Sequence, residues 1–251
     1  MSTSPDEPES ADCNEEYLCR DVTSRLLPLY HGPQVTIRLG SDGPTYMLSK
    51  ALLCKKSTYF SKMFEGNYAE ARTSFATLQE DTITFKPSFE LYIEWLYLGK
   101  LTLPGEDRSN QITCLLKLAR FAEMSGEGEL TDLVTASIIQ VITEAPEIRK
   151  KRNNPFPAKY RGINVKHIDV GHLAVVEELP RWNAVRRVLI MALVEPYLRA
   201  QPFIFSEELV LFSELAVDLL AEVKETMLAA VPRSGRIWIT DPLTQIEVPL
   251  K

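Results

Sequence analysis

The chain has 251 residues, of which 45% are hydrophobic and 25% are charged, the composition expected of a soluble protein with a substantial core. Its formal net charge is −6, and the first sixteen residues alone carry six carboxylates and no lysine or arginine. The other residues are close to neutral, with 28 acidic against 28 basic side chains. This balance argues against a basic domain that binds nucleic acid directly.

The acidic segment at 1–16 also contains proline and serine, so we predict a disordered tail there. The N-terminus has no positively charged stretch followed by an apolar one, and no apolar run approaches the ~18 residues of a membrane span. The four cysteines form no C-x-x-C pair, which favours reduced thiols. We therefore expect a soluble protein of the cytoplasm, the nucleus or both, with no membrane partner.

The N-terminal half alternates between helical and strand patterns. Pro28, Gly32 and Pro33 are expected to break the chain before a hairpin, and Ser49 and Ser57 are candidate N-caps of two successive helices. The predicted elements are a helix at 15–27, a hairpin at 34–48, helices at 49–56 and 57–65, a short strand at 75–79, and helices at 87–98, 110–125 and 129–143.

The C-terminal half begins with a segment at 146–162 that is rich in proline, asparagine and basic residues, and we predict a linker there. Three segments with helical apolar periodicity follow, at 167–179, 181–198 and 206–229. Ser206 is the expected N-cap of the third of these helices. The tail at 231–251 suggests a small hairpin around Asp241-Pro242.

The segment from the hairpin to the paired helices resembles the BTB/POZ family. The later stretches "SKMFEGNYAEA", "WLYLGKL" and "LLKLARFAEMSGEGELTDLVTASI" continue the resemblance, which covers roughly residues 30 to 143. The residues that carry the family pattern in the first part are Val35, Thr36, Gly40, Tyr46, Lys50, Leu52, Leu53, Ser57, Tyr59 and Phe60. Downstream, "IDVGHLAVVEELPRWNAVRRVLIMALVEPYL" is similar to the helical extension of fungal BTB proteins.

The resemblance implies an α+β fold, in which a BTB/POZ domain with a small β-sheet flanked by helices precedes an all-helical extension. The implied layout is a tail at 1–16, the BTB/POZ domain at 17–145, a linker at 146–162, the extension at 163–230 and a C-terminal tail at 231–251. The family commonly has Asp before its first strand and His before the next helix, whereas this chain has Gln34 and Ser49. The charged pair that Asp and His form in the family is therefore absent from this chain. This absence puts in doubt a partner contact or dimer packing that uses the charged pair.

Several residues invite a chemical interpretation. Cys54 precedes Lys55 and Lys56, which would activate a thiol, but the resemblance places it on an interior helix with no histidine assigned to it, so we interpret it as structural. His167 and His172 are five residues apart, which is not the spacing of a zinc site on a helix, so we expect surface or cap histidines. Glu177 and Glu178 are adjacent and expected on a solvated face.

The basic cluster at 148–152 is either a nuclear-import signal or a solvated loop. The chain shows no nucleotide-binding loop and no serine elbow, so we predict no catalytic site, no cofactor and no metal, and expect the protein not to be an enzyme.

The candidate partner-binding residues are Met63, Phe64, Tyr68 and Glu70. In BTB proteins that recruit cullin scaffolds, the loop after this helix carries a hydrophobic-x-Glu motif, and Tyr68-Ala69-Glu70 stands at that place. The alternative is that Tyr68 packs the loop while Glu70 is solvated, and Met63 and Phe64 suit a core as well as a contact.

We therefore predict a non-catalytic interaction module with protein partners. It would mediate self-association as a homodimer and partner recruitment, as a substrate adaptor for a cullin-type ubiquitin ligase. The alternative is a self-associating scaffold or transcription co-regulator with no ligase link. Direct nucleic-acid binding is not expected, because the chain has neither zinc-finger spacing nor a basic recognition helix.

Overall fold

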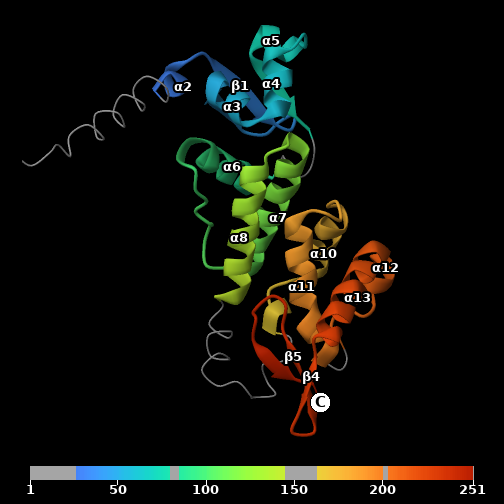
Figure 1. Ribbon diagram of the computed structural model, residues 1–251. Helices are drawn as coiled ribbons and strands as arrows, with labels where there is room; N and C mark the ends of the chain where they lie inside the picture. The colour runs from blue at the N-terminus through green and yellow to red at the C-terminus, as the bar shows by residue number, and fades with distance from the viewer. Residues whose placement is uncertain (1–26, 80–84, 145–162, 200–202, 251) are drawn as a thin grey trace, which may run out of the picture. The chain divides into compact units, whose positions relative to one another are not determined.

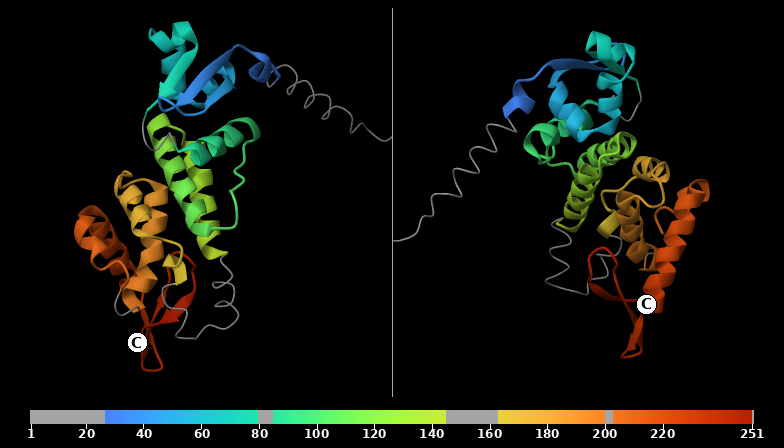
Figure 2. Two further views of the ribbon diagram at one scale, coloured as in Figure 1. Left: turned by 180° about the vertical axis from the view of Figure 1, so that it is seen from behind. Right: turned by 45° about the horizontal axis from the view of Figure 1, so that its top comes forward.

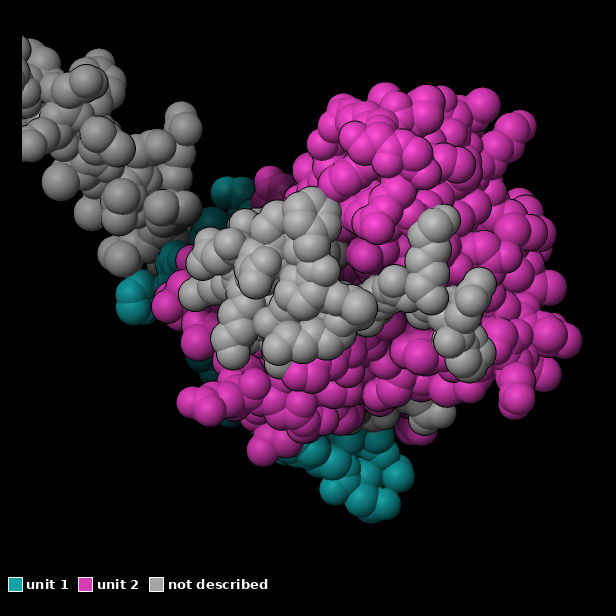
Figure 3. Space-filling model, turned by 90° about the horizontal axis from the view of Figure 1, so that it is seen from below, with its two compact units in different colours: residues 1–78 teal, residues 79–251 magenta. Residues whose placement is uncertain are grey.

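The computed structural model describes residues 27–79, 85–144, 163–199 and 203–250 (Figure 1). The predicted tail at 1–16, nearly all of the predicted helix at 15–27 and the predicted linker lie outside these residues. The chain divides into two compact units, residues 1–78 and residues 79–251, which Figure 3 shows in two colours. The first unit thus ends inside the predicted 17–145 domain, whose limits stay a prediction.

A three-stranded sheet organises the first unit. Its central strand pairs antiparallel with the following strand, as the predicted hairpin requires, and parallel with the third. Alternate side chains of the central strand, at Val35, Ile37 and Leu39, are buried, which confirms the predicted alternation. The strands are β1 (Gln34–Leu39), β2 (Thr45–Ser49) and β3 (Phe75–Leu78).

Four short helices accompany this sheet, and serine caps begin two of them. The Ser49 side chain accepts a hydrogen bond from the Leu52 N–H at 3.3 Å, and Ser57 accepts one from the Phe60 N–H at 3.5 Å, so both predicted caps are confirmed. The expected break at Pro28 is wrong, because proline is tolerated in the first turn of a helix. The helices are α2 (Leu27–His31), α3 (Lys50–Lys56), α4 (Thr58–Glu65) and α5 (Ala69–Thr73).

Cys54, on α3, carries a weakly acidic thiol. Burial is the main cause that raises its pKa to about 11, Glu65 adds to the rise, and Lys50 opposes it. The sulfur lies 3.7 Å from the backbone carbonyl oxygen of Phe60. Because only the thiolate is a good nucleophile, these surroundings suit a structural residue, although Cys54 is half buried and not fully buried.

The second unit begins with three helices whose predicted positions are confirmed to within about two residues. An aromatic cluster joins the first two of them, with the rings of Tyr92 and Phe121 edge to face at 4.6 Å between centroids. Gly99 ends the first helix in the left-handed conformation, at φ 67°. The helices are α6 (Lys86–Leu98), α7 (Arg108–Ser125) and α8 (Gly128–Thr143).

The C-terminal helices pack directly onto this group within the second unit. The helix α11 is buried along most of its length and contacts α8, α10 and α13, while α10 contacts α7 (Figures 1 and 2). The predicted extension therefore shares a core with α7 and α8. Its elements are η3 (Ile163–Val165), α10 (Val170–Glu177), α11 (Ala184–Arg199), α12 (Glu208–Leu211) and α13 (Ser213–Leu228).

A small antiparallel sheet follows α13. The predicted hairpin is present, and an additional strand that the sequence did not suggest precedes it. Buried Asp241 holds the turn, since its carboxylate accepts hydrogen bonds from the Asn164 side chain at 2.8 Å, the Leu243 N–H at 3.2 Å and the Thr244 hydroxyl at 2.5 Å. The strands are β4 (Val231–Arg233), β5 (Arg236–Thr240) and β6 (Glu247–Pro249).

The single helix predicted at 206–229 is wrong, because the structure has two helices there. The backbone of Phe212 leaves the helical region, with φ −103° and ψ 72°, and separates α12 from α13. Ser206 is not a cap of α13, since its hydroxyl donates to the Phe203 carbonyl. The cap comes instead from Glu177 of another helix, whose carboxylate accepts from the Glu214 N–H at 3.2 Å and the Leu215 N–H at 2.9 Å.

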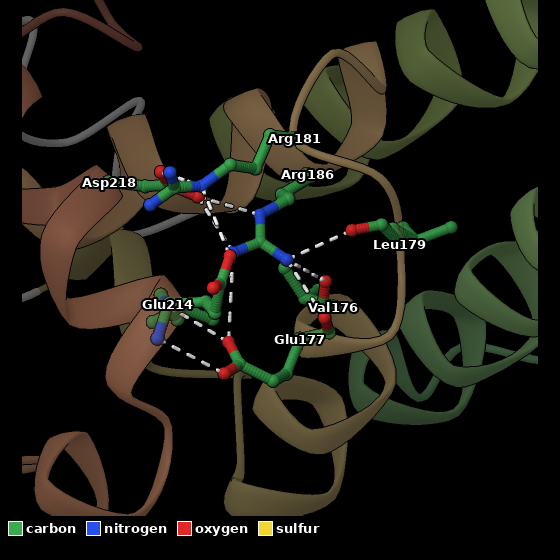
Figure 4. A network of polar contacts seen from close by, with 8 residues as sticks. Val176, Glu177, Leu179, Arg181, Arg186, Glu214 and Asp218 are labelled. Carbon is green, nitrogen blue, oxygen red and sulfur yellow. Dashed lines mark hydrogen bonds and ion pairs between the residues drawn. The ribbon is translucent and has the colours of Figure 1, made fainter.

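A buried arginine joins these C-terminal helices (Figure 4). Arg186, on α11, is 2% exposed, and its Nη1 donates to the carbonyl oxygens of Val176, Glu177 and Leu179 at 3.3, 2.8 and 2.9 Å. Its Nε donates to Asp218 Oδ2 on α13 at 2.8 Å. Nη2 lies 2.7 Å from the same oxygen but is not aligned for a hydrogen bond. The guanidinium thus supplies donors to the end of α10 and an ion pair to α13.

This network corrects the expectation of a solvated face for Glu177, whereas Glu178 is exposed as expected. Glu177 caps α13 and lies 3.7 Å from Nη2 of Arg186, so its carboxylate has a structural role. Glu178 forms an ion pair with Arg120 of α7. Adjacent acids on a short helix can point to different partners, because successive side chains are about 100° apart.

We expect Leu52→Ala to lower the free energy of unfolding by roughly 2 to 5 kcal/mol, because it removes a buried side chain and leaves a cavity. Urea denaturation followed by circular dichroism measures the change. Met47→Ala, at an exposed position on neighbouring β2, is the control and should have little effect. A near-neutral Leu52→Ala would contradict the placement of α3.

We expect alkylation of Cys54 by iodoacetamide to be slow at neutral pH and to accelerate about tenfold per pH unit below its pKa of about 11, because the thiolate is the reactive form. Mass spectrometry after timed labelling follows this residue separately. Cys114, whose pKa burial also raises, provides an internal comparison. Fast, stoichiometric labelling of Cys54 at pH 7 would refute a structural role.

We expect Arg186→Met to destabilise the second unit by about 3 to 5 kcal/mol, because it leaves Asp218 and three carbonyl groups without a buried donor. The matched control is Arg187→Met, whose exposed side chain makes one ion pair at 4.0 Å and should contribute under ~1 kcal/mol. Thermal denaturation compares the two. Equal melting temperatures for both variants would mean that the network is not stabilising.

Candidate protein-docking surface

The helix α4 buries one side and exposes another. Phe60 and Phe64 lie four residues apart, are buried, and stack with their ring centroids 6.2 Å from each other. Tyr59, Lys62 and Met63 share the adjacent side, because residues three and four apart meet on a helix. The buried aromatic pair therefore determines which side chains of α4 reach the surface.

The turn after α4 brings Tyr68 back beside the helix. The N–H of Gly66 donates to the Lys62 carbonyl at 3.1 Å and ends α4. A Cβ at position 66 would lie 2.3 Å from that carbonyl oxygen and 3.3 Å from the Tyr68 ring, so only glycine fits without a shift. The aromatic ring therefore lies directly against the turn, while 61% of Tyr68 remains exposed.

Five residues line a pocket of about 250 Å³ at this turn, and they come from α4 and from the start of α5. Two tyrosine rings and the Met63 thioether provide apolar walls, while one lysine and one glutamate add a charge of each sign. We call this group the docking surface: Tyr59, Lys62, Met63, Tyr68 and Glu70.

This arrangement suits recognition of a protein chain better than chemistry on a small molecule. Tyrosine offers a large apolar area at a low cost in side-chain entropy, and its hydroxyl can also form a hydrogen bond. Methionine adapts its shape to an incoming side chain. The opposite charges of Lys62 and Glu70 can orient a partner that carries complementary charges.

Three of the four predicted site residues come together here. Met63, Tyr68 and Glu70 line the pocket, whereas Phe64 is 1% exposed and belongs to the core beneath it. Tyr59 and Lys62 were not among the predicted residues. Tyr59 lies three residues before Lys62 and four before Met63 on the same helix, and this spacing is the signal that could have identified them.

The histidines provide no second site. His172 is 2% exposed, so the expectation of a surface or cap histidine holds only for the cap. Its Nδ1 accepts a hydrogen bond from the Asp169 N–H at 3.0 Å in a capping box, which leaves the ring proton on Nε2, 2.8 Å from the Thr113 hydroxyl. Burial lowers its pKa, although Asp169 opposes the shift. Both ring nitrogens are therefore occupied.

Metal binding also lacks a site in the part of the chain that the structure describes. No three histidine, cysteine or acidic side chains come together there in a way that could hold an ion. Within the same residues, no helix is long and apolar enough to cross a membrane. The basic cluster at 148–152 lies outside the described residues.

The two departures from the family pattern are neighbours in the sheet. Gln34 and Ser49 pair directly across β1 and β2. Gln34 is exposed, whereas Ser49 is buried and donates a hydrogen bond to the Leu29 carbonyl in addition to capping α3. Neither side chain is charged, so this position presents no charge with which a partner could form an ion pair.

A comparison with family models finds a BTB/POZ domain at residues 31–134. A comparison with curated proteins finds no match. The matched range contains the β1–β2 hairpin, the paired helices α3 and α4, and the first part of α8, which all lie in the region that carries the resemblance in the sequence. The mixed α+β fold with a helical C-terminal region agrees with this result. The chain therefore contains a BTB/POZ domain, at residues 31–134.

Proposed function

We propose that this protein is a substrate adaptor for a cullin-type ubiquitin ligase and that it contacts the cullin through the docking surface. A BTB/POZ domain makes the chain a protein–protein interaction module. The finer role is supported by the docking surface, where the hydrophobic-x-Glu motif at Tyr68-Ala69-Glu70 meets the outward side of α4.

The geometry of the motif is the observation that carries this proposal. The apolar ring surface of exposed Tyr68 is in contact with water, so its burial by a partner is favourable. The position of the ring against the Gly66 turn limits the side-chain entropy that is lost on binding. Glu70 lines the same pocket, so the apolar anchor and the charge are presented together. Such a combination of buried area and an orienting charge is typical of a binding hot spot.

The alternative function is a self-associating scaffold or transcription co-regulator without a ligase link. It would use the BTB/POZ domain for homodimer formation and would not need the docking surface. The uncharged pair at Gln34 and Ser49 argues against a dimer contact that depends on charge at this position. Under both readings the protein acts by binding other proteins, without a catalytic step or a cofactor.

The proposal predicts that Tyr68→Ala combined with Glu70→Lys abolishes capture of a cullin N-terminal region. Truncation of a hot-spot residue costs about 2 kcal/mol or more, so affinity should fall at least ~30-fold. Pull-down with a purified cullin N-terminal region, followed by titration calorimetry, measures the loss. Both changed residues are at the surface, so helicity and melting temperature should be nearly unchanged.

A matched control makes the same two kinds of change elsewhere. Trp182→Ala with Asp132→Lys removes an exposed aromatic side chain and reverses an exposed acid in the second unit, and it should leave capture intact. If the unchanged protein captures no cullin, the adaptor role is refuted and the scaffold role remains. Equal loss in both double variants would mean that the docking surface is not the contact.

A further inference from the structure

The outer side of α13 is apolar where a surface helix is normally polar. Val217 and Leu220 are each 55% exposed and Leu228 is 71% exposed, and the preceding helix α12 adds exposed Val210 and Leu211. Figures 1 and 2 show α12 and α13 at the outer edge of the second unit, with α13 beside α11. Clustered exposed apolar side chains of this kind mark interaction surfaces.

The spacing of these residues matches a helix-pairing seam. The inner side of α13 buries Leu215 and Leu219, which lie almost opposite Val217 and Lys224 at 100° per residue. Positions 217, 220, 224 and 228 are separated by the three- and four-residue steps that keep side chains on one side of a helix. We call Val217, Leu220, Lys224 and Leu228 the outer stripe.

The orientation of the outer stripe is held by the polar network on the inner side (Figure 4). Asp218 is bonded to Arg186 at 2.8 Å and lies 3.1 Å from Arg181. The first-turn N–H groups of α13 donate to the Glu177 carboxylate. These contacts prevent α13 from rotating to bury the stripe in its own unit, so the apolar side is presented in a fixed position.

The charges on α13 indicate what covers the stripe. Lys224 lies within the outer stripe and makes no ion pair with any residue that the structure describes. Glu214 lies ten residues earlier, at the edge of the stripe, and its half-exposed side chain forms an ion pair with Arg181. Ten residues correspond to about 15 Å along a helix, so the two charges cannot meet on one helix. They can meet between two antiparallel copies of α13.

An antiparallel pair of α13 helices would bury the apolar residues of the outer stripe and pair its charge. With the twofold axis between positions 218 and 219, Val217 of one copy faces Leu220 of the other, and Lys224 reaches Glu214. Leu228 then approaches the Val210 and Leu211 side chains of the other copy. A parallel pair would instead place Lys224 against Lys224, which is unfavourable.

We propose that the outer stripe is a self-association surface, on which a second copy of this chain docks through an antiparallel α13–α13 contact. The contact is isologous, so the same residues of both copies meet and the assembly closes as a dimer. It uses neither the docking surface nor the cullin motif, and it stands or falls independently of the proposed function.

The test compares reciprocal charge variants of the full chain by sedimentation equilibrium. Glu214→Lys alone and Lys224→Glu alone should each weaken association roughly tenfold, because each homodimer then contains two like-charged contacts. An equimolar mixture of the two variants should recover nearly the original affinity, since every contact in the mixed dimer again joins opposite charges. No contact within a single chain could produce this recovery.

Apolar variants provide a second readout. Leu220→Glu should weaken the same association step at least ~100-fold, because it buries two carboxylates in the interface. Ile237→Glu, at an exposed apolar position on β5, is the matched control and should have no effect. Circular dichroism melting checks that each variant is folded. Sedimentation equilibrium resolves successive steps, so an additional association through the first unit does not mask this one.

The proposal predicts that the unchanged chain associates at micromolar concentrations, because a small interface supports weak association. A monomer at these concentrations would overturn it, as would association that Leu220→Glu leaves unchanged. A mixture of the charge variants that associates no better than either variant alone would also overturn it.

Discussion

The burial of one side of α4 is the constraint on which the interaction surface depends. The stacked pair of Phe60 and Phe64 fixes the rotation of this helix about its axis. The side chains on its opposite side therefore face outward. Gly66 extends the effect, because the close approach at this turn places Tyr68 beside Met63. The docking surface is thus a consequence of core packing, and substitutions that disturb the core would also disturb it.

In the second unit, a polar network and not an aromatic pair fixes the orientation of a helix. Arg186 replaces apolar packing with a set of charge-assisted contacts that join the end of α10 to α13. Buried ion pairs contribute little net stability, because desolvation offsets their attraction, but they can fix the relative position of the elements that they join. Here the fixed geometry is the outward orientation of the α13 stripe. Both units therefore combine a packed interior with apolar side chains that are exposed at the surface.

Local sequence signals predicted the elements whose causes are local. Ser49 and Ser57 cap helices that begin beside them, and the alternation at Val35, Ile37 and Leu39 follows from the pleat of one strand. The resemblance to the BTB/POZ family identified the domain and located three members of the docking surface. The spacing on α4 could have supplied the other two.

The features that sequence reasoning missed depend on residues far apart in the chain. Glu177 caps a helix that begins 36 residues later, at Ser213, so no local pattern marks the cap or the break at Phe212. Asp241 accepts a hydrogen bond from the Asn164 side chain, and Nε2 of His172 on α10 lies 2.8 Å from the Thr113 hydroxyl on α7. These polar contacts form only after the helices have packed. Periodicity describes which side of an element is apolar, but it does not name the partner of a polar group.

The central claim is that the outward side of α4 and the start of α5 perform the recognition, while no internal cleft takes part. Hydrogen–deuterium exchange of the full chain, alone and with a saturating cullin N-terminal region, tests it most directly. We expect slower exchange at residues 58–73 in the complex and unchanged exchange in the second unit. Unchanged exchange at residues 58–73, or protection confined to another part of the chain, would contradict it.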